Sequence, residues 1–90
     1  MKYLKGTVSA PVERSCAVVT EKAYGFACWN GCRGFSGREW VEFFPKSQIK
    51  VGEEYDGKVD IFIPYWLFKN KGIYTNNVCD VQFDSELVTM

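Results

Sequence analysis

The stretch Lys58-Val59-Asp60-Ile61-Phe62-Ile63 places β-branched side chains at every second position. Successive side chains of a β-strand point to opposite faces, so Val59, Ile61 and Ile63 share one face. This alternation predicts a strand with one buried face, and it is the clearest structural signal in the sequence.

A short helix is expected directly after this strand. Pro64 suits the first turn of a helix, where its missing N–H costs no hydrogen bond, and Gly72 suits the position just past the end. Lys69 and Lys71 would lie in the last turn, at the negative end of the helix dipole. These signals predict a helix over 65–71.

Other segments repeat the two-residue alternation, and glycine-rich stretches separate them. We expect a turn over 52–57 and a loop or wide hairpin over 30–37, which holds three glycines. The sequence therefore predicts one all-β domain over 1–90, with about five strands forming a small barrel or curved antiparallel sheet and one short capping helix. The remaining strands are expected at Leu4, Val8 and Val12; at 23–29, where small residues on one face indicate that another backbone packs close; at 38–44; and at Cys79, Val81, Phe83 and Leu87.

Composition restricts the classes of function. The chain has 90 residues, 47% of them hydrophobic, and its 11 basic side chains balance 11 acidic ones. Residues 1–50 carry a net charge of +4 and residues 51–90 one of −4. A fold that separates these halves would have a dipolar surface, and a fold that interleaves them would not.

The first six residues lack the apolar core of a signal peptide, and no stretch approaches the roughly 20 apolar residues of a membrane span. We therefore expect a cytoplasmic protein with reduced thiols that makes no use of a membrane.

Four short segments span the middle of the chain: Lys22-Ala23 entering a strand, Trp40 followed by Pro45-Lys46-Ser47-Gln48-Ile49, Ile63-Pro64 with Trp66-Leu67, and Lys71-Gly72-Ile73. Through these segments, about half of the chain resembles short proteins encoded by bacteriophages and prophages. The 30–37 loop, the long first strand and the acidic segment after Ile73 depart from that pattern. The resemblance implies a mobile-element origin. It implies an activity less directly. By analogy with anti-CRISPR and other small phage proteins, we expect the chain to bind and inhibit a host protein or nucleoprotein complex.

The sequence contains no histidine, which removes histidine-based catalysis and histidine metal ligation. The carboxylates Glu53, Glu54 and Asp56 fall in the expected turn, where they are expected to be solvated charges. We therefore predict no enzymatic activity and no cofactor.

Four cysteines leave a thiolate zinc site open as a third interpretation. Cys28 and Cys32 would supply half of it, but Cys16 and Cys79 belong to separate segments, whereas strong zinc signals have two closely spaced pairs. Buried free cysteines are the favoured interpretation, and a Cys28–Cys32 disulfide is an alternative in vitro.

The candidate binding site centres on the 30–37 loop. Aromatic rings with arginines serve both protein hot spots and single-strand nucleic-acid platforms. For a protein partner, the loop would insert into a groove, or the acidic side chains of 80–86 would imitate a phosphate backbone. For a nucleic acid, Lys22 would join the loop arginines in neutralising phosphates. The candidate residues are Trp29, Arg33, Phe35, Arg38, Lys46, Asp80, Asp84 and Glu86.

Four bulky residues in the expected helix cannot all face one side. We expect Trp66 and Leu67 to plug the core, together with Trp40, and Tyr65 and Phe68 to form a self-association patch that makes a homodimer.

Overall fold

The computed structural model describes residues 1–30 and 38–90, and within them the chain forms seven strands, one α-helix and two short 3₁₀ helices. The all-β prediction is confirmed, with two curved antiparallel sheets in place of a closed barrel. No helix in the described part is long and apolar enough to cross a bilayer. The elements are β1 (Lys2–Ser9), η1 (Val12–Ser15), β2 (Val18–Val19), β3 (Ala23–Asn30), β4 (Arg38–Pro45), β5 (Lys50–Tyr55), β6 (Lys58–Pro64), α1 (Tyr65–Asn70), η2 (Thr75–Asn77) and β7 (Gln82–Thr89).

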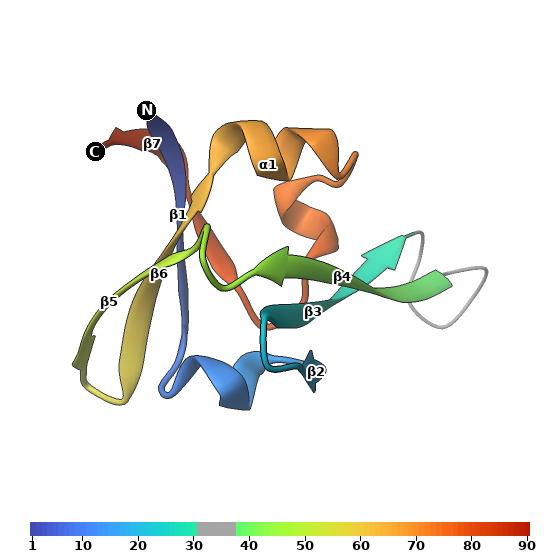
Figure 1. The fold of residues 1–90 in the computed structure, drawn as a ribbon, viewed down its shortest axis with the longest axis horizontal. Coiled ribbons are helices and arrows are strands. Elements are labelled where there is room, and N and C mark those ends of the chain that lie inside the picture. The colour runs from blue at the N-terminus through green and yellow to red at the C-terminus, as the bar shows by residue number, and fades with distance from the viewer. Residues whose placement is uncertain (31–37) are drawn as a thin grey trace.

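The first sheet has the order β5-β6-β1-β7 and the second the order β2-β3-β4. Figure 1 shows the β3–β4 hairpin extending away from the first sheet, with α1 above it. The chain ends lie together because β1 pairs with β7, and the Met90 N–H donates to the Met1 carbonyl.

The predicted 58–63 strand is confirmed as β6, and it pairs with β1 so that their apolar faces coincide. Leu4 lies opposite Ile63, and Val8 lies opposite Val59. All four side chains are buried, so the two-residue alternation sets the register by placing both apolar rows on the inner face. Because β1 lies between β6 and β7, the first sheet interleaves the two halves of the chain.

Two segments differ from the prediction. Residues 52–55, expected in a turn, belong to β5, and the turn is confined to Asp56 and Gly57, both at positive φ. Every residue of β5 is exposed, so this edge strand lacks the buried alternating row that would mark it in the sequence. Val12 belongs to η1, not to the first strand, although its side chain is buried as expected.

A row of aromatic rings joins the two sheets and the helix. Phe26 and Phe44 come from β3 and β4, with ring centroids 6.0 Å apart. Phe44 stacks on Phe68 of α1 at 6.4 Å, and Phe68 meets the edge of Phe83 in β7 at 5.5 Å. This row forms much of the core, because aromatic pairs bury large areas in a short chain.

The helix forms where the sequence predicts it, with Gly72 at φ +70° just beyond it. The predicted roles of Trp66 and Phe68, one buried and one exposed, are exchanged. Trp66 is 47% exposed and Phe68 only 4%, so Trp66 is not a core plug and Phe68 is not in a self-association patch. Residues two apart lie about 200° apart around a helix, so burial of Phe68 turns Trp66 outward. Leu67 and Trp40 pack against the core as predicted.

Candidate functional site

The β3–β4 hairpin has one face in the core and one face outward. Its strands pair in unbroken register from Ala23 opposite Pro45 to Asn30 opposite Arg38. Phe26, Cys28 and Phe44 occupy the inner face and are buried. The intervening residues therefore form the outer face of the second sheet.

That outer face is largely apolar, and we call Val18, Gly25, Ala27, Val41 and Phe43 the outer apolar face. Val18 is 42% exposed and Phe43 40% exposed. A methyl group added to Gly25 would lie 2.8 Å from Val41 Cγ1, 2.9 Å from Phe43 Cε1 and 2.9 Å from the Val18 carbonyl oxygen. The side chains of Val41 and Phe43 therefore cover the glycine. The small residues of 23–29 predict a close backbone on this face, and at Gly25 the Val18 carbonyl meets that expectation beside the two side chains.

The candidate residues predicted around the hairpin do not form one cluster. Trp29 lies opposite Glu39 near the tip of the hairpin, whereas Lys46 follows Pro45 at its base. Lys46 is seven positions along the chain from Glu39, or about 23 Å at the rise of a strand. Lys46 instead places its ammonium 5.1 Å from the centre of the Tyr24 ring. Arg33 and Phe35 lie outside the described residues, and Arg38 opens β4.

The acidic candidates lie on the other sheet. Asp84 and Glu86 belong to β7, whereas Asp80 precedes it in a turn at φ +60°. The pairing of β7 with β1 shifts register between Leu4 and Gly6, so residues 79–87 do not present one continuous strand face. The Lys5 ammonium is 3.7 Å from an oxygen of Asp84, which leaves that carboxylate partly neutralised.

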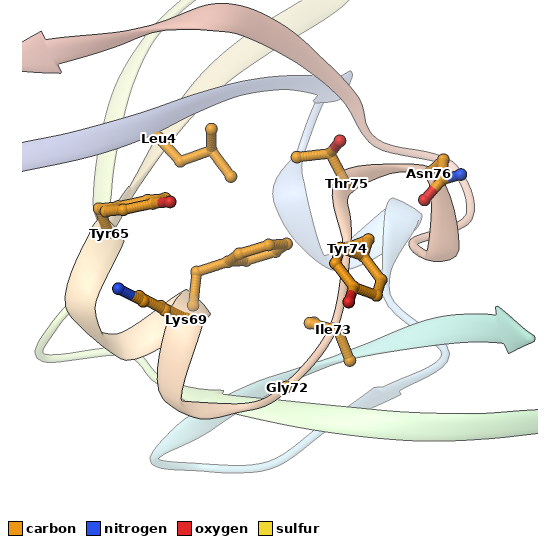
Figure 2. Close-up of a pocket in the computed structure, with 9 residues that line it drawn as sticks. Leu4, Tyr65, Lys69, Gly72, Ile73, Tyr74, Thr75 and Asn76 are labelled. Atoms are coloured by element: carbon orange, nitrogen blue, oxygen red, sulfur yellow. The ribbon is translucent and has the colours of Figure 1, made fainter.

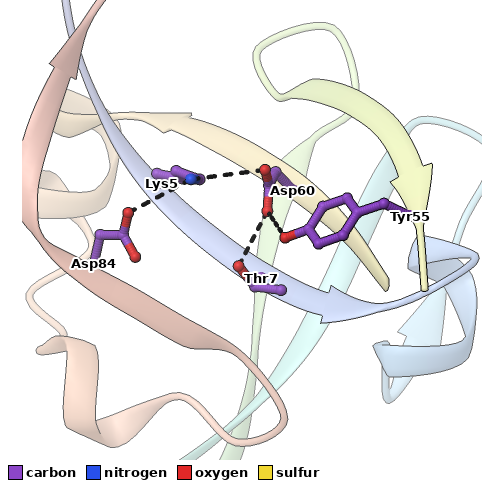
Figure 3. A network of polar contacts seen from close by, with 5 residues as sticks. All are labelled: Lys5, Thr7, Tyr55, Asp60 and Asp84. Carbon is purple, nitrogen blue, oxygen red and sulfur yellow. Dashed lines mark hydrogen bonds and ion pairs between the residues drawn. The ribbon is translucent and has the colours of Figure 1, made fainter. Parts of the chain in front are cut away.

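A polar network that the sequence did not reveal lies on the outer side of the first sheet (Figure 3). Asp60 accepts hydrogen bonds from the hydroxyls of Thr7 at 3.1 Å and Tyr55 at 2.8 Å, and the Lys5 ammonium is 3.7 Å away. Thr7 and Asp60 are register partners, so the pairing of β1 with β6 is what brings them together. In the sequence these residues appear only as polar side chains at outward positions. Their grouping can be predicted only when the register of β1 with β6 is known.

The thiols do not assemble a metal centre within residues 1–30 and 38–90, where no three histidine, cysteine or acidic side chains are close enough to hold an ion. Cys32 lies outside those residues. Burial, with Glu42 and then Cys79 nearby, raises the pKa of the Cys28 thiol to about 11. Burial, with Glu13 nearby, raises the pKa of Cys16 likewise to about 11. Both groups are therefore poorly disposed to become thiolate ligands at neutral pH.

No protein-family model, no curated protein and no solved structure matches the chain. The function must therefore be inferred from the geometry of the site, and the outer apolar face is the part of the β3–β4 hairpin that is available for binding.

Proposed function

We propose that the protein is a non-enzymatic binding protein that docks on a host protein or complex through the outer apolar face. The observation that carries this proposal is the exposure of Phe43 and Val18 on a regular sheet, beside Val41. Contiguous exposed apolar side chains on a rigid scaffold are typical of protein interfaces. Because these side chains are held across Gly25, little side-chain entropy is lost when a partner covers them.

The edge position of β4 supports the same proposal. Its only strand partner in the described residues is β3, so one side of its backbone is available to a partner at the margin of the face. Phe43 next to the open edge of β4 suits a partner protein that packs side chains on the face and pairs an extended segment with the edge.

Single-strand nucleic-acid binding is the weaker candidate. A nucleic-acid platform interleaves aromatic rings with cations along one groove, and zero net charge gives no overall attraction to phosphates. On this hairpin, Glu39 is the register partner of Trp29, and Lys46 is at the far end. This distribution favours a protein partner.

The resemblance to phage-encoded proteins suggests which kind of partner is bound, where it is bound and with what effect. On that basis the partner is a bacterial defence or replication protein, the encounter takes place in the host cytoplasm, and binding inhibits the partner as anti-CRISPR proteins inhibit theirs.

Affinity capture from bacterial lysate tests the docking face. Phe43→Ser replaces an exposed ring on the face, and Trp66→Ser replaces an equally exposed ring on α1, so the two variants form a matched pair. We expect Phe43→Ser to lose a specifically captured protein that Trp66→Ser retains, with both variants keeping the wild-type circular dichroism. Equal capture by wild type and Phe43→Ser would reject the face as the docking site.

Two further measurements separate the alternatives. Sedimentation of the isolated protein reports self-association, and dimers lost only in Phe43→Ser would assign the face to a second copy of the chain. Titration with a fluorescent single-stranded oligonucleotide across a salt series reports nucleic-acid binding. Tight, salt-sensitive binding there would replace the protein-docking proposal.

A further inference from the structure

A cavity of about 650 Å³ lies between α1 and the segment that follows it. None of the described residues that line it belongs to the β3–β4 hairpin. The volume of the cavity falls within the roughly 300–1,000 Å³ of small-molecule sites. Figure 2 shows Tyr65 and Tyr74 at opposite ends of the cavity, with Leu4 above it and Ile73 below. The residues that line it are Leu4, Tyr65, Phe68, Lys69, Gly72, Ile73, Tyr74, Thr75 and Asn76.

Local structure fixes the backbone on both sides of the cavity. Tyr65 and Lys69 are one helical turn apart and so share one face of α1. Gly72, at φ +70°, reverses the chain toward Tyr74. The Tyr74 N–H donates to the side-chain oxygen of Asn77 at 3.1 Å.

The inner surface of the cavity is apolar. Leu4, Phe68 and Ile73 line it and belong to the buried core, so only their outermost atoms are available to a ligand. Tyr65 and Tyr74 add two exposed rings. An aromatic ring gains most from such surroundings, because it contacts other rings without losing conformational entropy.

The charged group at the cavity is a cation, the Lys69 ammonium. Among the described residues that line the cavity, Lys69 is the only ionisable side chain apart from the tyrosines, and none is a carboxylate. Lys71, two residues on, is 3.4 Å from Glu42, whereas Lys69 has no ion pair among the described residues. The hydroxyl of Thr75 and the amide of Asn76 add neutral donors.

We propose that this cavity binds a small anion with a planar, aromatic body. The ring lies between Tyr65 and Tyr74, over the apolar inner surface, and the acidic group faces the Lys69 ammonium. The site is independent of the outer apolar face, so it adds a ligand to the protein-docking function proposed above.

Two fluorescent probes that differ in charge test this assignment. 1-Anilinonaphthalene-8-sulfonate carries an aromatic body and one sulfonate, and N-phenyl-1-naphthylamine has the same body without the charge. Each is titrated into the wild-type chain and into Lys69→Gln, Tyr74→Ala, Lys58→Gln and Phe43→Ser. The last two remove an exposed cation and an exposed ring that do not line the cavity.

We expect saturable, one-to-one binding of the sulfonate probe. Lys69→Gln should weaken it by about two- to fivefold, the effect of one charge pair near the surface, and should leave binding of the neutral probe essentially unchanged. Tyr74→Ala should weaken both probes, while Lys58→Gln and Phe43→Ser should leave both unchanged.

Three results would overturn the assignment: no saturable binding of the sulfonate probe, equal weakening by Lys58→Gln and Lys69→Gln, or loss of binding in Phe43→Ser alone. The last result would place the probe on the outer apolar face. Failure of Phe43→Ser to disturb protein capture, by contrast, concerns only the docking proposal. The two proposals therefore fail separately.

Discussion

The side-chain amide of Asn77 donates a 2.8 Å hydrogen bond to the carbonyl of Trp29, 48 residues earlier in the chain. The same side chain accepts the Tyr74 N–H through its oxygen. Next to it, the Cys79 N–H donates to the Ala27 carbonyl at 2.9 Å. Asn77 therefore ties the outer part of β3 to the segment that forms one side of the cavity.

Replacing Asn77 with alanine should disconnect these two parts. Two hydrogen bonds are lost, each worth about 0.5–1.5 kcal/mol, so we expect the free energy of unfolding to fall by about 1–3 kcal/mol. Faster hydrogen exchange at the Tyr74 amide would locate the effect. Asn76→Ala, at an exposed neighbour with no such bonds in the described structure, should change stability by less than about 0.5 kcal/mol. Equal losses in the two variants would show that the tie is unimportant.

Gly25 is the position where a small residue is needed most. An added methyl group meets Val41, Phe43 and the Val18 backbone at under 3.0 Å, so the strands must shift to accept it. We expect Gly25→Ala to cost about 1–3 kcal/mol in urea unfolding, the usual range for overpacking.

Gly52 provides the matched control for Gly25. It also lies in a strand, but its nearest neighbour would be 3.4 Å from the added methyl group, an ordinary contact. Gly52→Ala should be neutral or slightly stabilising, because alanine restricts the unfolded chain. A loss at Gly52 as large as that at Gly25 would mean that strand glycines are required here for another reason.

The sequence predicts the strands in which every second side chain is apolar and buried. It misses the strands that lack such a buried row. The strand at 58–63 is readable because Val59, Ile61 and Ile63 are all buried on one face. The exposed edge strand β5 has no inward row, and β2 has only two residues. Both form because neighbouring strands offer hydrogen-bond partners, and this information is absent from the local sequence.

The candidate site is less predictable than the fold. Chemical type alone predicts Trp29, Lys46 and Asp84 as binding residues, but strand register places them near a hairpin tip, at a hairpin base and on another sheet. The cavity was not predicted at all. It depends on how α1 lies against the chain after Gly72, which the helix signals themselves do not specify.

The reversed roles of two aromatic residues in α1 give a direct test of the core. Phe68 contacts the rings of Phe44 and Phe83, so Phe68→Ala should destabilise by about 3–5 kcal/mol. Trp66 is half exposed, and Trp66→Ala should cost less than about 1 kcal/mol. Thermal or urea unfolding measures both. If the tryptophan variant proved the less stable of the two, the orientation of the helix would be wrong.

The network around Asp60 should contribute to stability in a graded way (Figure 3). Asp60→Ala removes an acceptor of two hydroxyl donors and an ion pair, and we expect it to cost about 2 kcal/mol. Tyr55→Phe removes one hydrogen bond and should cost about 1 kcal/mol. Asp84→Ala removes only an exposed ion pair, worth under about 1 kcal/mol. Denaturant unfolding should return this order, and an equal effect at Asp84 would contradict it.

The thiol of Cys28 should make stability depend on pH in the alkaline range. Burial raises its pKa from 9.0 to about 11 in the folded protein, so between these values the unfolded chain releases the proton and the folded chain keeps it. The contribution of the thiol is therefore complete below pH 9 and is lost as pH rises through 11. For one proton the slope reaches about 1.4 kcal/mol per pH unit.

Cys28→Ala separates this contribution from the other groups that titrate there, including Tyr24, whose pKa is also raised by burial. The stability difference between wild type and Cys28→Ala, measured by urea unfolding at pH 8, 9, 10 and 11, should be constant below pH 9. It should shrink above pH 9, because only the wild type loses stability through this thiol. A difference that stays constant up to pH 11 would mean that the thiol ionises as readily in the folded protein as in the unfolded chain, and that Cys28 is therefore not shielded from water.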